Sequence, residues 1–169
     1  GGRSPDQHTI EIKSREYAFD LNWTSHVHLK QLSFIGGGIQ CPVSSSSILM
    51  DDLHVRYGGS GLDGLQPGRA AIWLKGNGHT LLNSQIEESY GGGVITLGTF
   101  TEIRNNVIRD CMLYGIASFD SSDIHVHQNT IYGNQGENIH MYSPRGRFNY
   151  NHCYHAGRRV TDSASLNSN

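Results

Sequence analysis

Histidine, arginine and glutamate recur in this 169-residue chain at a regular spacing. The chain holds ten histidines, and five of them fall between positions 125 and 155. Glu102, His125 and Arg147 are separated by 23 and 22 residues. Arg104 and His127 follow the first two of these residues at a distance of two. Histidine titrates near neutral pH and is the residue that most often transfers protons in enzymes. Side chains of these types, if neighbours in space, suit acid–base chemistry on an anionic substrate.

A repeat of about 22 residues is the element that would make them neighbours. Segments in which Asn, Gln or Ser precedes an apolar residue end at Ile86, Ile108, Ile131 and Cys153, and two upstream segments that end at Phe34 and Val55 fit the same template. Four of the five steps are 21, 22, 23 and 22 residues long. The step from Val55 to Ile86 is 31, because a Gly-rich loop at 58–69 is inserted there. Self-similarity at such a period is typical of a solenoid, in which each coil buries its apolar face against the next.

Within each repeat, short β-branched runs alternate between apolar and polar residues and are broken by Gly, Asn and Asp, which predicts strands. No segment shows a helical apolar period over ten or more residues. We therefore expect an all-β solenoid of about six coils of 21–23 residues, each with three short strands that pair in parallel with the next coil. The solenoid is expected over 9–157, with an N-terminal tail at 1–8 and a polar C-terminal tail at 158–169.

Stacked coils lie about 4.8 Å apart, so residues one repeat apart should touch. One outward column is predicted to hold Glu102, His125 and Arg147, and the next to hold Lys30, Asp51, Leu82, Arg104, His127 and Asn149. A third column holds Arg56, Glu87, Arg109, Tyr132 and Tyr154. A fourth holds Trp73, Thr96, Ala117 and His140, with Tyr142 and Arg145 after it.

A polar column marks a tight turn between two of the strands. It consists of Asp52, Asn83, Asn105 and Gln128, followed one position later by Ser84, Asn106, Asn129 and Asn151. On this Asn-x-(Ile/Val) ladder the chain resembles the right-handed parallel β-helix family, the pectate-lyase-like repeat proteins, over roughly residues 9–157. The resemblance implies a right-handed single-stranded parallel β-helix. It also implies a secreted or extracellular bacterial protein that processes polysaccharide.

The charge and the distribution of apolar residues exclude two classes of binding partner, nucleic acid and the membrane interior. The net charge of −2 provides no basic stripe for nucleic acid, and no apolar run of 18 residues is present for a membrane span. Six coils make a short stack with unpaired strand edges at both ends. We therefore expect flanking coils of the same parent protein, or self-association at the ends, and a polysaccharide or oligosaccharide as the ligand.

The first mechanism that these residues suit is β-elimination on a uronate polysaccharide. It needs a cation to neutralise the sugar carboxylate, a base to remove the α-proton and an acid near the leaving oxygen. The predicted catalytic residues are Glu102, Arg104, His125, His140, Tyr142 and Arg147, with His125 or His140 as base, Tyr142 as acid and Arg104, Arg147 or Arg145 as the cation. The predicted substrate contacts are Trp73, His127, Tyr132 and Arg145.

No metal ligands are predicted from the sequence, and none is required by this mechanism. The resemblance implies that calcium can serve related lyases. However, Asp51 and Asp52 are consecutive on a strand and should face opposite sides, so they do not form an acidic calcium cluster.

Two alternatives remain open. Glycoside hydrolysis needs two carboxylates on either side of the scissile bond, about 5–9.5 Å apart. The candidates are Glu87, Glu88, Asp110, Asp120 and Asp123, of which Glu88 and Asp110 fall in one column. The second alternative is a non-catalytic binding or structural module that presents Trp73, Tyr132, Tyr142 and Tyr154 to sugar rings.

Overall fold

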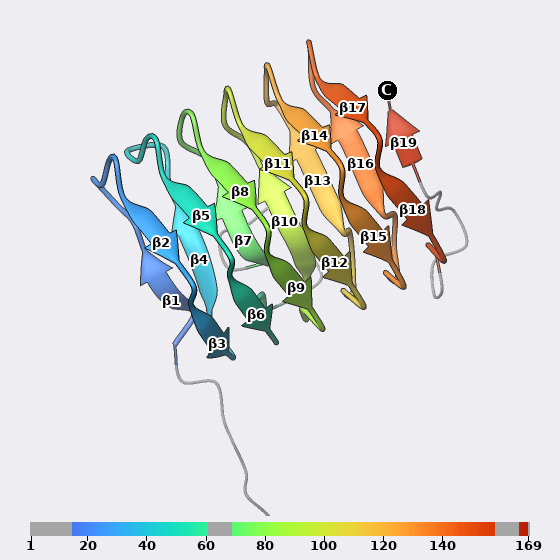
Figure 1. Ribbon diagram of the computed structural model, residues 1–169, viewed down its shortest axis with the longest axis horizontal. Helices are drawn as coiled ribbons and strands as arrows, with labels where there is room; N and C mark the ends of the chain where they lie inside the picture. Colours follow the sequence, from blue (N-terminus) through green and yellow to red (C-terminus); the bar gives the residue numbers. More distant parts are fainter. Residues whose placement is uncertain (1–14, 61–68, 158–165, 169) are drawn as a thin grey trace, which may run out of the picture.

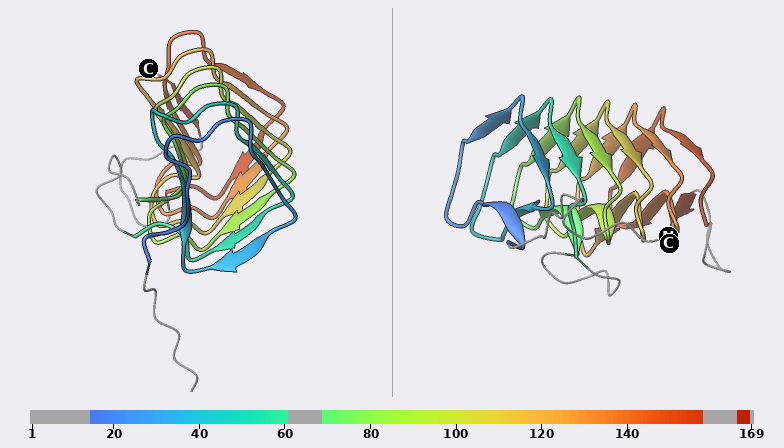
Figure 2. Two further views of the ribbon diagram at one scale, coloured as in Figure 1. Left: turned by 90° about the vertical axis from the view of Figure 1, so that its left-hand side faces the viewer. Right: turned by 90° about the horizontal axis from the view of Figure 1, so that it is seen from below.

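Three parallel β-sheets surround one apolar core in the computed structural model, which describes residues 15–60, 69–157 and 166–168. Each coil of the chain adds one strand to each sheet, and the coils stack along the long axis of the molecule (Figure 1). Seen from one end of the stack, successive coils share one outline and are displaced progressively from one another (Figure 2, left). The described residues contain no helix, and so none that could span a membrane. The expected all-β solenoid of about six coils is confirmed.

The three sheets take every third strand of the chain. The first sheet consists of β1 (Tyr17–Asp20), β4 (Gly38–Cys41), β7 (Ala70–Leu74), β10 (Gly92–Thr96), β13 (Ile116–Phe119), β16 (Ile139–Tyr142) and β19 (Leu166–Ser168). The second consists of β2 (His28–Lys30), β5 (Leu49–Asp51), β8 (Thr80–Leu82), β11 (Glu102–Arg104), β14 (His125–His127) and β17 (Arg147–Asn149). The third consists of β3 (Ser33–Ile35), β6 (His54–Arg56), β9 (Gln85–Glu87), β12 (Val107–Arg109), β15 (Thr130–Tyr132) and β18 (His152–Tyr154).

The apolar residues of the repeat form a continuous column in the core. In the third sheet Val55, Ile86, Ile108 and Ile131 pair in order and are fully buried. Burying one such side chain contributes about 1.5–3 kcal/mol. The equivalent buried column of the second sheet consists of Leu81, Ile103 and Val126. Because side chains alternate across a strand, the residues on either side of Ile103 and Val126 must face outward.

The turn between the second and third sheets explains the polar column of the sequence. Asp52, Asn83, Asn105 and Gln128 all have positive φ, between 52° and 56°. Asn and Asp adopt this left-handed region more readily than most residues. The chain can therefore turn within two residues and begin the next strand in the same register on every coil.

The first sheet corrects one predicted column. Comparison of the internal repeats predicted that Thr96 lies beside Trp73 and Ala117, but in the structure Ile95 pairs with both of them. Thr96 belongs to the neighbouring buried column. The slip of one residue arises because Val94 and Ile95 are both apolar and both fully buried. The polar–apolar alternation that fixes the register of the other sheets is therefore missing here.

The predicted N-terminal tail at 1–8 lies outside the described residues, and two other predicted segments lie mostly outside them. Of the Gly-rich loop at 58–69, only residues 58–60 and 69 are described. Of the expected polar tail at 158–169, the described part is β19, which pairs in parallel with β16 and extends the first sheet by one strand.

Candidate functional site

The predicted column of Glu102, His125 and Arg147 forms on the outer face of the second sheet. Glu102 pairs with His125, and His125 pairs with Arg147. The neighbouring column places Arg104 beside His127. The residues on β11 and β14 alternate with the buried Ile103 and Val126, and Arg147 alternates with the half-buried Phe148 on β17, so the backbone ladder presents them together on one side. The sequence repeat therefore located this cluster of side chains correctly.

Direct contacts connect the members of this cluster. His127 Nε2 lies 3.0 Å from Glu102 Oε1, and Arg104 Nε lies 3.4 Å from the same oxygen. The rings of His125 and His127 are stacked, with centroids 4.0 Å apart and planes 17° apart. His125 Nε2 lies 3.3 Å from Asn149 Oδ1 on the next strand. Each ring is thus held between a polar partner and the other ring.

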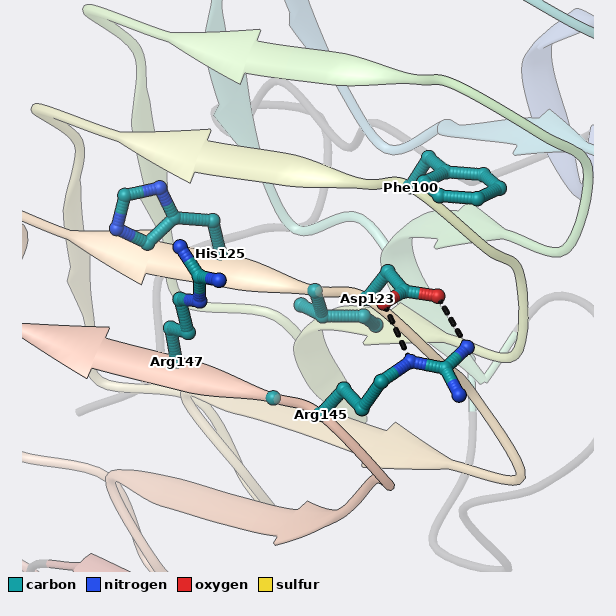
Figure 3. Close-up of a pocket in the computed structure, with 7 residues that line it drawn as sticks. Phe100, Asp123, His125, Arg145 and Arg147 are labelled. Atoms are coloured by element: carbon teal, nitrogen blue, oxygen red, sulfur yellow. Dashed lines mark hydrogen bonds and ion pairs between the residues drawn. The ribbon is translucent and has the colours of Figure 1, made fainter.

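An open trough runs along this face across β14 and β17. One depression, of about 530 Å³, is lined by Phe100, Asp123, Ile124, His125, Arg145, Gly146 and Arg147 (Figure 3). A second, of about 400 Å³, is lined by His125, His127, Gln128, Arg147, Asn149 and Tyr150. The two depressions share His125 and Arg147. These two residues therefore mark the middle of the trough.

The two arginines of the trough differ in their partners. Arg145 donates two hydrogen bonds to Asp123, at 2.7 and 2.6 Å, and these bonds are drawn in Figure 3. They hold the pKa of the Asp123 carboxyl below its usual value, so the charge of Arg145 is already compensated. The side chain of Arg147 extends toward His125 instead (Figure 3). Within the described part of the chain Arg147 has no carboxylate within 4.0 Å, which leaves its guanidinium available to an anionic ligand.

Two aromatic residues that the sequence analysis missed stand at the ends of the trough. Phe100 lines the first depression and Tyr150 the second, and their side chains are 63% and 88% exposed. Both have positive φ, 52° and 57°. A bulky aromatic residue rarely adopts this conformation. The sequence feature that could have identified them is their place in a turn next to a strand of the second sheet: Phe100 precedes β11 and Tyr150 follows β17.

Other predicted site residues lie on the first sheet, away from this trough. In Figure 1 the first sheet lies behind the second, so the outer faces of the two sheets point in different directions. His140 faces outward from β16, where its ring packs on Tyr114 and Phe119 with centroid distances of 5.2 and 5.1 Å. Its Nδ1 lies 2.5 Å from Glu137 Oε2. The structure therefore does not bring His140, or Tyr142 two residues further along the same strand, together with His125.

The remaining predicted substrate contacts are also dispersed. Trp73 on β7 is only 4% exposed and packs with Ile95 and Ala117, so it is not open to a ligand from solution. Tyr132 lies on the third sheet, where its ring stacks on that of Tyr154 at 4.7 Å. Of the residues expected to bind substrate, His127 and Arg145 are the two that line the trough.

The comparison with known proteins agrees with this architecture. A family model described as the right-handed beta helix region matches residues 37–169. The chain belongs to the right-handed β-helix family. No curated protein and no solved structure matches it. The family is compatible with proteins that act on polysaccharides, and the match itself names neither a function nor a substrate.

Two of the carboxylates considered for glycoside hydrolysis, Glu87 and Glu88, lack the raised pKa that a general acid needs. Glu87 is buried, which by itself would raise its pKa, but hydrogen bonds from His54 and Gln85 and the charge of Arg109 lower it overall. Hydrogen bonds from Tyr57 and Arg56 lower the pKa of Glu88. A hydrolase needs one carboxyl with a raised pKa as general acid. Neither of these two residues meets that need.

Calcium, which the resemblance to pectate-lyase-like proteins implies, does not fit this face of the β-helix. Calcium takes about six to eight oxygen ligands. The described residues contain one group of three His, Cys, Asp or Glu side chains whose ligand atoms all lie within 4.8 Å of one another, and it consists of Glu102, His125 and His127. One carboxylate and two imidazoles are instead the ligand set of a transition metal.

Proposed function

We propose that this β-helix binds a uronate-containing polysaccharide in the trough across β14 and β17 and cleaves it by β-elimination. The observation that carries the proposal is that an imidazole and a guanidinium, His125 and Arg147, share the middle of one open trough. Elimination needs a base and a cation at one substrate carbon, and these two residues are cross-strand neighbours. Because such polymers lie outside cells, we also propose an extracellular location.

The role proposed for Arg147 is to bind the sugar carboxylate. A guanidinium can donate two parallel hydrogen bonds to a carboxylate. Neutralising this charge lowers the pKa of the proton on the adjacent carbon, since removing that proton spreads negative charge into the carboxylate. The charge of Arg145 is compensated by Asp123, so the proposal gives Arg145 a part in shaping the trough rather than in neutralising the substrate.

The role proposed for His125 is to remove that proton. If Nε2–H of His125 donates to Asn149 Oδ1, 3.3 Å away, the Nδ1 lone pair is free to act as the base. The electrons of the broken C–H bond form a carbon–carbon double bond, and the glycosidic oxygen leaves from the neighbouring carbon. This oxygen takes its proton from the imidazolium or from water in the open trough. One chain end is then an unsaturated uronate and the other a new reducing end.

The surrounding residues support binding and orientation in this proposal. Stacking of His127 on His125 fixes the plane of the catalytic ring, and Glu102 fixes His127. Exposed aromatic rings present apolar faces on which sugar rings can stack. Phe100 and Tyr150 provide such faces at the two ends of the trough, so a chain of several sugars would contact both.

The test is to incubate the protein with soluble uronate polymers and follow two products. Elimination gives ultraviolet absorbance from the new double bond together with new reducing ends. We expect Arg147→Gln to lower the rate by about 100-fold or more and Arg147→Lys to retain part of it, because a lysine keeps the charge but not the paired hydrogen bonds. Reducing ends without the absorbance would show hydrolysis, and binding without either product would show a binding module. Both results would overturn the proposal.

A further inference from the structure

We propose that Glu102, His125 and His127 form a binding site for a divalent transition-metal ion of the zinc class. One ligand atom from each of these side chains lies within 4.8 Å of the others. The site shares His125 with the proposed elimination but does not depend on it. It concerns the affinity of the protein for a metal ion in the absence of any sugar.

The backbone positions the three ligands without the help of a loop. His125 and His127 are two residues apart on β14 and so face the same side of the sheet. Glu102 is the direct neighbour of His125 on β11. Between them, Ile103 and Val126 are fully buried in the core. Ligands carried on paired strands above a packed core are held more precisely than ligands on loops.

The distance between two of the ligand atoms suits a shared ion. Zinc binds histidine nitrogen and carboxylate oxygen at about 2.0–2.2 Å, so two such ligands with a bond angle of 90–110° are roughly 2.9–3.4 Å apart. His127 Nε2 and Glu102 Oε1 are 3.0 Å apart. The His125 ring is stacked on that of His127 at 4.0 Å, so in this proposal it rotates about its side-chain torsions to point a nitrogen at the same ion. Three protein ligands on an open trough leave the remaining positions of the ion to water.

Charged neighbours of the cluster set an upper limit on the affinity. Arg104 Nε lies 3.4 Å from the Glu102 oxygen that the ion would use, and Arg147 stands beside His125 on β17. Both cations repel a metal ion. We therefore expect the affinity to increase when the charge of Arg104 is removed, which a purely structural role for the Glu102–His127 hydrogen bond would not produce.

A bound ion and the proposed elimination make competing demands on His125. The ion uses an imidazole lone pair, and ligation holds the ring away from the position in which it can accept a proton from the substrate. We expect the metal-loaded protein to be inactive in elimination. Binding is measured without sugar, so failure of the metal site leaves the elimination test untouched, and failure of elimination leaves the metal test untouched.

The experiment is titration of the tag-free protein with Zn²⁺ in a calorimeter, with Co²⁺ absorption spectra to report nitrogen and oxygen ligation. We expect one ion per chain. His127→Ala and Glu102→Gln should each weaken binding by about tenfold or more, and Arg104→Gln should tighten it several-fold. The matched control is His152→Ala, which removes an exposed histidine of β18 that lies outside the cluster.

Three results would overturn the proposal. The first is the absence of stoichiometric binding to the folded wild-type protein. The second is wild-type affinity in His127→Ala with its circular-dichroism spectrum unchanged. The third is an equal loss of affinity in His152→Ala and His127→Ala, which would show that the ion binds surface histidines without selectivity.

Discussion

The ring of His79 is fully buried, and both of its nitrogens have a partner. Nδ1 accepts a hydrogen bond from the backbone N–H of Ile48 at 3.3 Å, and Nε2 lies 3.2 Å from Ser45 Oγ. This pattern requires a neutral ring with its proton on Nε2. Burial lowers the pKa of His79 to about 4 from the ordinary 6.5. A second proton, on Nδ1, would point at the N–H of Ile48, so two donors would face each other and this hydrogen bond would be lost.

This residue predicts an acid-sensitive stability. Above pH 6.5 the ring is neutral in both the folded and the unfolded chain, and its contribution is fully present. As the pH falls from 6.5 toward 4, the unfolded chain takes up a proton that the folded chain refuses, so the free energy of unfolding decreases by about 3 kcal/mol in total. The prediction is checked by measuring the free energy of unfolding of the wild type and of His79→Gln by urea denaturation between pH 6.5 and 4. The variant should lose less stability on acidification, and an equal loss would contradict the assignment.

At the scale of single elements, the turn between the second and third sheets is held by an asparagine ladder. The side-chain oxygen of Asn129 accepts hydrogen bonds from the backbone N–H and the side-chain amide of Asn106, both at 3.0 Å. Its own amide donates to Ile103 O at 2.9 Å. Asn151 repeats the pattern one coil further, accepting from Asn129 N and Nδ2 at 3.0 Å. Buried turn groups that no strand can reach are satisfied in this way.

We predict that Asn129→Ala destabilises the protein by roughly 2–4 kcal/mol, because it leaves several buried donors and acceptors without partners. The matched control is Asn105→Gly in the adjacent, exposed column. Asn105 donates one side-chain hydrogen bond, to Asn83 at 2.7 Å, and glycine tolerates its φ of 54°. The Asn105→Gly substitution should lower the free energy of unfolding by less than about 1 kcal/mol. Chemical denaturation compares the two, and equal losses would argue against the ladder as the stabilising element.

The same elements show what the sequence could predict. The repeat placed Glu102, His125 and Arg147 in register, because strict alternation around Ile103 and Val126 leaves one way to stack β11 on β14. Where alternation is absent, as at Val94 and Ile95, the prediction slipped by a residue. The repeat spacing therefore predicts cross-strand neighbours correctly only for strands in which one face is buried and the other is exposed.

At the scale of the whole molecule, each coil is stabilised by the coils on either side, so one core position affects the entire stack. Ile108 is fully buried between Ile86 and Ile131. We predict that Ile108→Asp unfolds the domain, since it buries an unpaired charge at a cost of roughly 4–5 kcal/mol or more. Val107→Asp is the matched control, because the adjacent side chain faces outward and is 37% exposed. Circular dichroism should show loss of the β-sheet signal for Ile108→Asp alone.

The arrangement of the whole molecule also explains which part of the site could not be predicted. His125 and His140 are close in sequence and have the same chemistry. His125 lies on β14 of the second sheet and His140 on β16 of the first, and the chain between them passes through β15 of the third sheet, so the two histidines face different directions. The repeat period determines which residues stack along the axis, but it does not determine the angles between the sheets. The same applies to Phe100, which precedes β11, and to Tyr150, which follows β17, because the repeat period does not show that both turns border the trough.

The central claim is that the chemistry takes place on the second sheet, and comparing two variants tests it most directly. We would measure the initial rate at which unsaturated uronate appears for His125→Ala and His140→Ala, with thermal transitions recorded for both. We predict a loss of about 100-fold or more for His125→Ala, while His140→Ala retains a rate near that of the wild type. An active His125→Ala protein beside an inactive, folded His140→Ala protein would place the site on the first sheet and contradict the proposal.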